Sequence, residues 1–300
     1  MTSKHFVVPL SEEQQPQSVI DSLLSFGDEM ASEWGSYLKS LLWADSPDPD
    51  NEPDSVPAAL LEHDVWPHEM KHQCRAMRDC WRFVVNELEL EGLRDVFDHR
   101  FDHCYCKECR STTAEITERG DEVYVLPDGW CRFGLNPRAM IEQYGGDTSI
   151  VNVMFDRRES SGWPVGFHGS HPRHIRSILN EGRLLKPSQR TKTGTEITVT
   201  HVCTIGGLQA PAEVYERIFF SPSIRYCEWY CKQPPASTHL CVLQARIRKS
   251  MADVGHETLA GRVEDKYVER HEMEWSVKDG IHTPLYGLLI RERPEQFFFR

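Results

Sequence analysis

The segment VGFHGSHPRHIRSILNEGRLLKP at residues 165–187 decides the fold of this chain. Its apolar beginning predicts a short strand that ends in His-Gly-Ser at residues 168–170. A helix follows, because apolar residues recur at helical spacing between positions 175 and 179, and Gly182 is expected to end it. Gly169 has no Cβ, so a flat ligand can approach the main chain there and pair with its amide groups. The segment therefore predicts a strand, a ligand-binding strand end and a helix.

Two later blocks extend this pattern toward the C-terminus. RIFFSPSIRYCEWYC at 217–231 predicts a strand, a Ser-Pro-Ser turn and a helix that carries Tyr226, Trp229 and Tyr230. HEMEWSVKD at 271–279 holds two carboxylates two residues apart, and such residues share one face of a strand. Strands and helices thus mix after residue 150, and we expect an α+β fold.

In this order, the three blocks resemble the catalytic domain of the poly(ADP-ribose) polymerase family of ADP-ribosyltransferases. The first strand of that family ends in Trp-His-Gly-Ser or Tyr-His-Gly-Thr before an Ile-Leu-x-x-Gly helix, as FHGS and SILNEG do at 167–182. Its second block, from Ile-Tyr-Phe-Ala to Asn-Tyr-Cys, is similar to 217–231, and its Glu-Tyr-x-Val-Tyr-Asp is similar to 274–279. The resemblance covers residues 163–300 and implies an ADP-ribosyltransferase-like split β-sheet core with NAD as co-substrate.

At matching positions the resemblance implies a role in NAD binding for each residue. His168 would bond the adenosine ribose, the Gly169 backbone would hold the nicotinamide carboxamide, and Ser170 would touch the adenine side. Tyr230 would stack on nicotinamide. Glu274 would be the catalytic glutamate, which stabilises the oxocarbenium-like transition state as nicotinamide leaves. Glu274 and His168 are thus the expected catalytic residues.

Four further positions are expected to bind the co-substrate, and some depart from the family pattern. The usual triad is His-Tyr-Glu, but Phe219 stands where the tyrosine belongs and lacks the hydroxyl that positions the nicotinamide ribose. Cys227 falls where a serine contacts the carboxamide. Either Ser221 or Tyr226 supplies the missing polar contact, or activity is weakened or lost. In the same comparison, the loop 188–216 would cover NAD, and 248–268 would meet the acceptor.

A metal site is predicted ahead of these blocks. Three cysteines crowd into six residues, at Cys104, Cys106 and Cys109. One turn of backbone can aim three such thiolates at one point, and zinc prefers four soft ligands in a tetrahedron. Cys131 is the best fourth ligand by type, with His99 and His103 as alternatives. A closed four-ligand site would be structural, since catalysis needs an open position. Chance packing and redox chemistry are the competing explanations.

The first half of the chain divides into two ranges. Residues 1–60 predict amphipathic helices followed by the acidic, proline-rich linker ADSPDPDNEPDSVP. Residues 61–150 predict a helical region and the Cys-rich zinc segment, and 151–300 the catalytic domain. In 61–150 one apolar stripe is typical of a buried helix face, formed by Met77, Trp81, Val84, Val85 and Leu88. EVYVLPDGWCRFGL at 122–135 predicts strands around a Pro-Asp-Gly turn.

The Cys-rich segment also resembles a known arrangement. FDHCYCKEC, followed by LPDGWCRFGL and then FHGS, is similar to the C-terminal region of neuralized-like proteins, where a cysteine cluster precedes a transferase-like domain. That resemblance would make 95–300 one unit with an integral metal site.

Charge and hydropathy argue against two classes of partner, nonspecifically bound duplex nucleic acid and the membrane, and leave a local basic groove possible. The net charge is −12, and residues 1–70 account for all of it, with fourteen acidic residues against Lys4 and Lys39. The remaining chain is formally neutral, which argues against nonspecific duplex binding. No stretch approaches the roughly 18 apolar residues that span a bilayer, and no leader segment is recognisable. We expect a soluble, intracellular protein without a membrane partner, and its oligomeric state is left open.

The leading functional hypothesis is NAD-dependent transfer of a single ADP-ribose unit, with release of nicotinamide. The acceptor would be a protein side chain or a nucleic-acid end, and the enzyme would be a mono-ADP-ribosyltransferase of the glycosyltransferase class. Two alternatives remain: a catalytically silent interaction or scaffold module of the same fold, and an RNA 2′-phosphotransferase-like enzyme.

Overall fold

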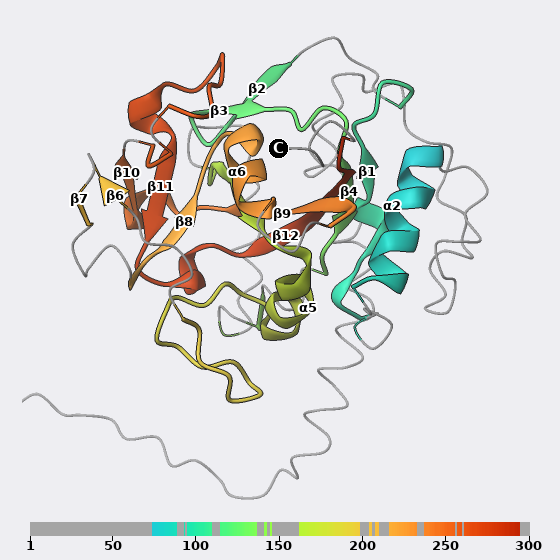
Figure 1. Cartoon of the computed structure of the whole chain (residues 1–300), viewed down its shortest axis with the longest axis horizontal. Helices are drawn as coiled ribbons and strands as arrows, with labels where there is room; N and C mark the ends of the chain where they lie inside the picture. Colours follow the sequence, from blue (N-terminus) through green and yellow to red (C-terminus); the bar gives the residue numbers. More distant parts are fainter. Residues whose placement is uncertain are drawn as a thin grey trace, which may run out of the picture. The chain divides into compact units, whose positions relative to one another are not determined.

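The structure is a computed structural model of the whole chain. It describes residues 74–88, 93, 95–109, 115–136, 141–142, 145, 162–198, 204–205, 208–209, 216–232, 237–255, 257–259 and 261–294. The helices and acidic linker expected in residues 1–60 lie outside this set. The chain separates into residues 1–40 and 41–300, so every described residue belongs to the second unit. That unit mixes helices and mostly antiparallel sheets, which confirms the α+β class (Figure 1).

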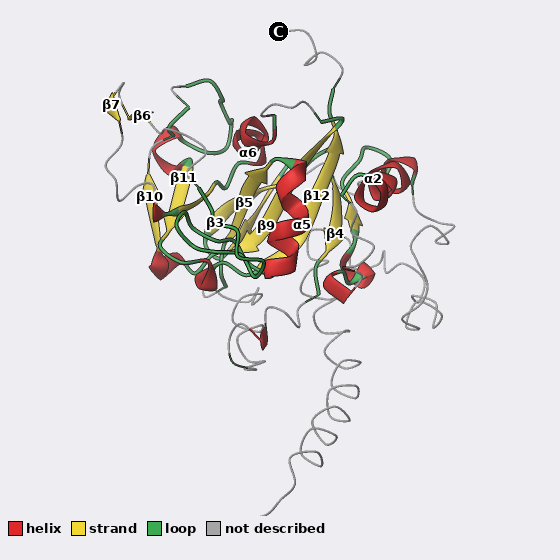
Figure 2. Cartoon of the chain, turned by 60° about the horizontal axis from the view of Figure 1, so that its bottom comes forward, coloured by secondary structure: helices red, strands yellow, loops and turns green. Residues whose placement is uncertain are grey.

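A five-stranded sheet forms the centre of this unit. Its order is β1 (His103–Cys104), β4 (Cys131–Gly134), β12 (Leu285–Glu292), β9 (His239–Arg246) and β5 (Val165–Ser170). All neighbouring strands are antiparallel. Figure 1 shows α5 and α6 on opposite sides of β9 and β12, and Figure 2 shows α5 in front of these strands with α2 beside β4. The ranges 61–150 and 151–300 therefore meet inside one sheet.

A second, three-stranded sheet adjoins the first. It contains β10 (Ala252–Gly255), β11 (Glu274–Val277) and β8 (Ile218–Phe220), all antiparallel. The two sheets meet at a bridge between Phe167 of β5 and Ser221, the residue after β8. Paired backbone hydrogen bonds of 2.8 and 2.9 Å close this bridge. The end of β5 and the start of β11 thereby lie on opposite sides of β8.

Two helices pack near this junction, as their sequence predicts. Helix α5 (Pro172–Glu181) has His171 as its N-cap and proline in its first turn, and Gly182 ends it with a φ of 72°. Left-handed backbone of this kind favours glycine at a helix end. Helix α6 (Ile224–Cys231) begins at Ser223, whose hydroxyl accepts a hydrogen bond from the Tyr226 amide at 3.2 Å. Helix α6 packs against β5 and β9.

The predicted apolar stripe in the first half forms helix α2 (Arg75–Asn86). Met77, Trp81 and Val84 are buried against β4 and β12. The Trp81 ring contacts Phe97 edge-on, at 5.6 Å between ring centroids. These side chains belong to the same hydrophobic core as the apolar residues of β9, β11 and β12. The helical region and the C-terminal half thus share one core.

The remaining described elements are short. Strands β2 (Ile116–Arg119) and β3 (Glu122–Val125) form a hairpin, and β6 (Thr204–Ile205) pairs with β7 (Leu208–Gln209). Four 3-10 helices are η5 (His99–Phe101), η7 (Lys249–Met251), η8 (Arg270–Glu272) and η9 (Gly280–His282). Among the described residues, no helix is long and apolar enough to cross a bilayer.

The Pro-Asp-Gly turn is present, but its flanking strands do not pair with each other. The Trp130 amide donates to the Pro127 carbonyl oxygen at 3.1 Å and closes the turn. Among the described strands, β3 pairs with β2, whereas β4 pairs with β1 and β12. The turn therefore carries the chain from the small hairpin into the main sheet.

Candidate functional site

Glu274 is a carboxylate held at the first position of β11. Its residue is 7% exposed, and β10 runs beside it with Gly255 directly opposite. Glu272, expected to share a strand face with Glu274, instead lies in η8 and is exposed. The strand begins only at Glu274, so alternation along a strand does not relate the two carboxylates. Glu274 is therefore the one that the fold buries.

Three hydroxyl groups converge on a single oxygen of Glu274. Oε1 accepts hydrogen bonds from Tyr226 Oη, from Thr258 Oγ1 at 2.6 Å and from Tyr230 Oη at 3.3 Å. Burial is the main cause that raises the pKa of both phenols, and the charge of Glu274 adds to it. Both phenols thus stay protonated and can donate. All three bonds end on Oε1, so among the described residues Oε2 is the oxygen left for a ligand.

Tyr226 and Tyr230 reach Glu274 from one face of helix α6. They are four residues apart, so they lie one above the other on the helix surface, and their rings meet edge-on at 5.9 Å. Tyr226 is buried, whereas Tyr230 is half-buried. Of the two candidates for the missing tyrosine contact, the structure brings Tyr226 to the glutamate. Ser221 instead accepts a bond from the Ser223 amide at 3.1 Å and shapes the turn before α6.

His168 lies near the end of β5, across β8 from Glu274. Its Nδ1 is 2.8 Å from the carbonyl oxygen of Phe219. A carbonyl can only accept, so Nδ1 carries the proton and a neutral ring presents Nε2 as an acceptor. Burial lowers the pKa of His168, which favours this neutral form. Phe219 thus contributes its backbone to the site, where the family pattern has a tyrosine hydroxyl.

Gly169 is required by close packing of β5 against α6. A Cβ built on Gly169 would lie 2.0 Å from the carbonyl oxygen of Cys227. The Cys227 thiol donates to the carbonyl oxygen of Phe167 at 3.1 Å, and burial raises its pKa. Ser170 is buried at the end of the same strand. The predicted carboxamide-binding residues Gly169 and Cys227 are therefore neighbours, and Cys227 is a neutral thiol.

Residues that precede Glu274 in the sequence line a surface hollow of about 460 Å³. Residues 264–270 and Met273 line it. Met273 precedes Glu274, and its side chain packs with Tyr226, Val268 and Val125 in a small apolar cluster. Residues 264–268, the end of the segment expected to meet an acceptor, thus form part of a concave surface.

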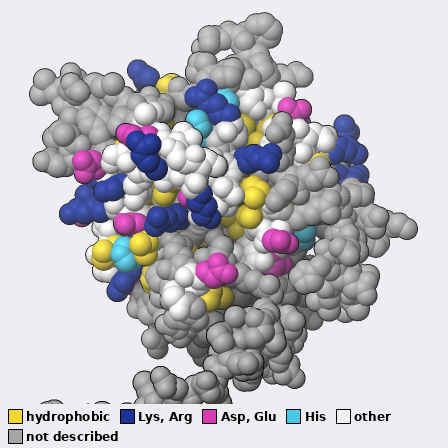
Figure 3. All heavy atoms as spheres, turned by 90° about the horizontal axis from the view of Figure 1, so that it is seen from below, with side chains coloured by type: hydrophobic (Ala, Val, Ile, Leu, Met, Phe, Trp, Pro, Cys, Tyr) yellow, Lys and Arg dark blue, Asp and Glu magenta, His cyan; other side chains and the backbone are white. Residues whose placement is uncertain are grey.

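Helix α5 and the loop after it contribute basic residues to the surface. Arg173, His174 and Arg176 are exposed on α5, and Arg190 and Lys192 are exposed after it. On the face shown in Figure 3, Lys and Arg side chains alternate with Asp, Glu and His. In the expected NAD-covering loop 188–216, residues 188–198, 204–205, 208–209 and 216 are described. The charge on this face is mixed.

Four thiols form a second candidate site, at the start of α2. They belong to Cys74, Cys104, Cys106 and Cys109, and their sulfurs all lie within 4.8 Å of one another. The Cys74 and Cys104 sulfurs are 3.3 Å apart, and those of Cys106 and Cys74 are 3.8 Å apart. Zinc–sulfur bonds of about 2.3 Å in a tetrahedron place the sulfurs about 3.8 Å from each other. The cluster can therefore hold a metal ion, and its geometry is compatible with zinc.

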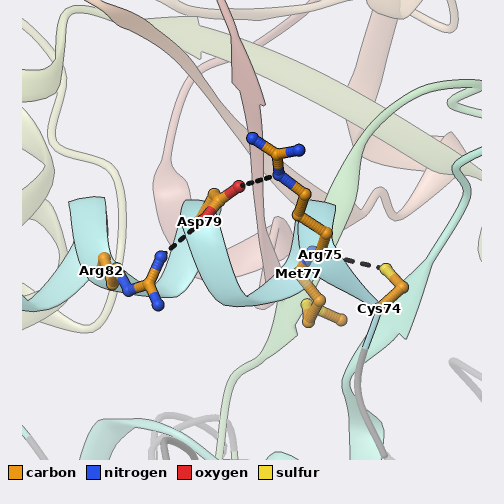
Figure 4. A network of polar contacts seen from close by, with 5 residues as sticks. All are labelled: Cys74, Arg75, Met77, Asp79 and Arg82. Carbon is orange, nitrogen blue, oxygen red and sulfur yellow. Dashed lines mark hydrogen bonds and ion pairs between the residues drawn. The ribbon is translucent and has the colours of Figure 1, made fainter.

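Cys74 is fixed by its place at the helix start. It is the N-cap of α2, and its sulfur accepts a hydrogen bond from the Met77 amide at 3.4 Å (Figure 4). Further along the helix, Asp79 pairs with Arg75 and Arg82 on the exposed face. Burial raises the pKa of the Cys74 thiol to about 11, and the hydrogen bond from the Met77 amide opposes this rise. The helix start thereby presents Cys74 to the other three cysteines.

The fourth thiol of the cluster is Cys74, and the three expected candidates for the fourth ligand lie outside the cluster. Cys131 is opposite Cys104 in the β1–β4 ladder, with 3.7 Å between the sulfurs, but it is not one of the four clustered thiols. A hydrogen bond from the Cys131 thiol is the main cause that lowers the pKa of Cys104, to about 5. His99 Nδ1 is 2.9 Å from the buried carboxylate of Asp102. His103 stacks edge-on against Tyr105. Cys131 therefore lies beside Cys104 at the edge of the cluster.

Sequence reasoning missed Thr258 and Cys74. A single threonine in a loop has no motif that marks it, and Cys74 precedes the cysteine cluster by thirty residues. No protein-family model matches this chain.

Proposed function

We propose that the chain is an NAD-dependent mono-ADP-ribosyltransferase that acts through Glu274. The observation that carries the proposal is the arrangement around this carboxylate. Oε1 is saturated by Tyr226, Tyr230 and Thr258, and Oε2 is left for a ligand. A buried carboxylate oriented in advance is suited to stabilise positive charge as a leaving group departs.

The other predicted contacts fit a nucleotide co-substrate lying across the end of β5. His168 presents Nε2 as an acceptor, which suits a ribose hydroxyl, because Nδ1 is committed to the Phe219 carbonyl oxygen. Tyr230 is half-buried, so its ring is available for stacking on nicotinamide. The resemblance assigns the carboxamide to Gly169, where a larger residue would collide with α6.

In this proposal NAD supplies an activated ribosyl bond, and the protein stabilises its cleavage. Glu274 Oε2 accepts hydrogen bonds from the nicotinamide ribose and faces the cationic ribosyl group. The bond from ribose C1 to nicotinamide breaks, and a nucleophile of the acceptor forms the new bond at C1. The family pattern has a tyrosine where this chain has Phe219, which lacks a hydroxyl. In this chain the Tyr226 hydroxyl anchors the carboxylate. The acceptor is a protein side chain or a nucleic-acid end near residues 264–273.

The cysteine cluster has a structural role in this proposal. We assign it zinc, held by Cys74, Cys104, Cys106 and Cys109. Four protein ligands close the coordination sphere, so the metal ties the start of α2 to β1 and takes no part in the transfer.

Labelled NAD tests the proposed function directly. Wild-type protein and Glu274→Ala are incubated with adenine-labelled NAD and a mixed pool of proteins and nucleic acids. We expect label to enter acceptors of one class with wild type only, as single units after digestion. Equal label transfer by both proteins, or none by either, would contradict the proposal.

A further inference from the structure

Thr258 approaches Glu274 from a different element than the two tyrosines do. Its Oγ1 donates to Glu274 Oε1 at 2.6 Å, and its amide donates to the Tyr226 hydroxyl oxygen at 2.9 Å. Thr258 Oγ1 and Tyr226 Oη are themselves 3.4 Å apart. One residue thus contacts both the carboxylate and the phenol that holds it, so the three groups form a closed triangle of polar contacts.

The chain around Thr258 is anchored, so this triangle has a fixed geometry. Gly255, the last residue of β10, pairs with Glu274 across the β10–β11 ladder. The Glu257 amide then donates to the Arg270 carbonyl oxygen at 2.9 Å and closes the connection at its base. Thr258 is the next residue after this closure. These two pairings place Thr258 beside Glu274, where its hydroxyl reaches Oε1.

A glutamate side chain needs such an anchor to act in one orientation. It has three rotatable bonds, and freezing them costs free energy that local contacts must offset. The tyrosines hold Oε1 from α6, and Thr258 holds it from the segment after β10. Two donors from different elements define the plane of the carboxylate, which one donor cannot do. Oε2 is thereby aimed in a single direction.

We infer that Thr258 is a positioning residue that sets the catalytic orientation of Glu274 through its hydroxyl group. The inference rests on the proposed function, and it names a residue outside the family-derived set. Without the hydroxyl, Oε1 keeps only its tyrosine donors, and the carboxylate gains rotational freedom. NAD binding rests on several other contacts besides Glu274, so it changes less than kcat does.

Steady-state release of nicotinamide from NAD tests the inference with three variants. Thr258→Val keeps the shape but loses the hydroxyl, Thr258→Ser keeps the hydroxyl, and Glu274→Gln removes the charge. A hydrogen bond to a charged group has a strength that corresponds to a change of about tenfold to hundredfold in rate. We expect Thr258→Val to lower kcat by this factor, while KM and the calorimetric Kd for NAD change by less than about threefold. Thr258→Ser is expected to restore kcat to within about threefold of wild type.

The matched control is Thr283→Val. Thr283 is fully buried, and its hydroxyl donates to the Gly280 carbonyl oxygen at 3.0 Å. The control loses an equivalent bond away from the carboxylate, so it should lower the melting temperature and leave kcat unchanged.

Each outcome of these assays decides between the two proposals. If Glu274→Gln is inactive and Thr258→Val keeps wild-type kcat, the positioning role is wrong and the proposed function stands. An equal fall of kcat in Thr283→Val would also overturn the positioning role, since the loss would then reflect stability. If wild type releases no more nicotinamide than Glu274→Gln, the proposed function fails, and the inference fails with it.

Discussion

Replacing Gly169 by alanine is expected to destabilise the protein by forcing β5 away from α6. A Cβ at this position would lie 2.0 Å from the carbonyl oxygen of Cys227, 2.8 Å from its carbonyl carbon and 3.2 Å from its Cα. All three are backbone atoms of a helix, so no side-chain rotation relieves the contact. The helix or the strand must move by more than about 1 Å to reach ordinary contact distances.

The size of the effect follows from two opposing contributions. Inserting an atom into a packed region costs about 1–3 kcal/mol, and the rigid partner places this case at the upper end. Alanine recovers up to about 1 kcal/mol by restricting the unfolded chain. We expect a net loss of about 2 kcal/mol, which corresponds to a fall in melting temperature of roughly 4–8 °C for a unit of this size.

Gly255→Ala supplies the control, since the nearest atom to its added Cβ is Glu274 O at 3.9 Å. Urea unfolding followed by tryptophan fluorescence gives the free energy of unfolding, because Trp229 lies on α6 itself. Gly169→Ala should unfold at lower urea than Gly255→Ala with the same slope. If both variants unfold at the same urea concentration, β5 and α6 do not pack as closely as the structure has them.

Three further predictions concern the metal, the pH and the ion pair between Glu228 and Arg291. Wild type is expected to purify with about one zinc ion per chain, Cys131→Ser should retain this zinc, and Cys74→Ser should contain much less. Mass spectrometry measures the metal content, and equal loss of zinc in both variants would return Cys131 to the ligand set. Burial lowers the pKa of His168 in the folded protein below its ordinary 6.5. Between the folded and the unfolded pKa, the unfolded chain therefore binds more protons. The stability that is present above pH 6.5 is lost as the pH falls from 6.5 through the folded pKa. The slope is at most about 1.4 kcal/mol per pH unit, and His168→Gln should reduce it in urea unfolding at several pH values; an unchanged slope would show that His168 does not titrate in this way. Glu228→Ala removes a carboxylate that accepts a hydrogen bond from Arg291 at 2.7 Å and leaves the Arg291 guanidinium over Trp130. The free energy of unfolding in the same assay should fall by about 2 kcal/mol. A change below about 0.5 kcal/mol would mean that the pair is solvated.

Local patterns predicted the elements near the candidate site correctly. The helical spacing in α5, its glycine end and the Ser-Pro-Ser start of α6 are set by neighbours in sequence. Periodicity likewise identified the buried face of α2. Glu272 was placed wrongly, because the 3-10 turn η8 delays the start of β11 and alternation begins only at Glu274.

Long-range pairings could not be derived from the sequence. Cys131 was chosen as a ligand by residue type, and it does lie opposite Cys104. The fourth place in the cluster depends on how α2 packs against the sheet, which brings Cys74 to β1. Thr258 contacts Glu274 only because β10 pairs with β11 in the observed register. Cys74 and Thr258 can be assigned to these sites only once the order of the strands is known.

The rate of nicotinamide release from NAD shows whether Glu274 acts in catalysis. We expect measurable release by wild type and, since Glu274 stabilises the departing charge, a fall in kcat of about a hundredfold or more in Glu274→Gln, with the fold retained by circular dichroism. Equal release rates in wild type and Glu274→Gln would contradict this role of Glu274.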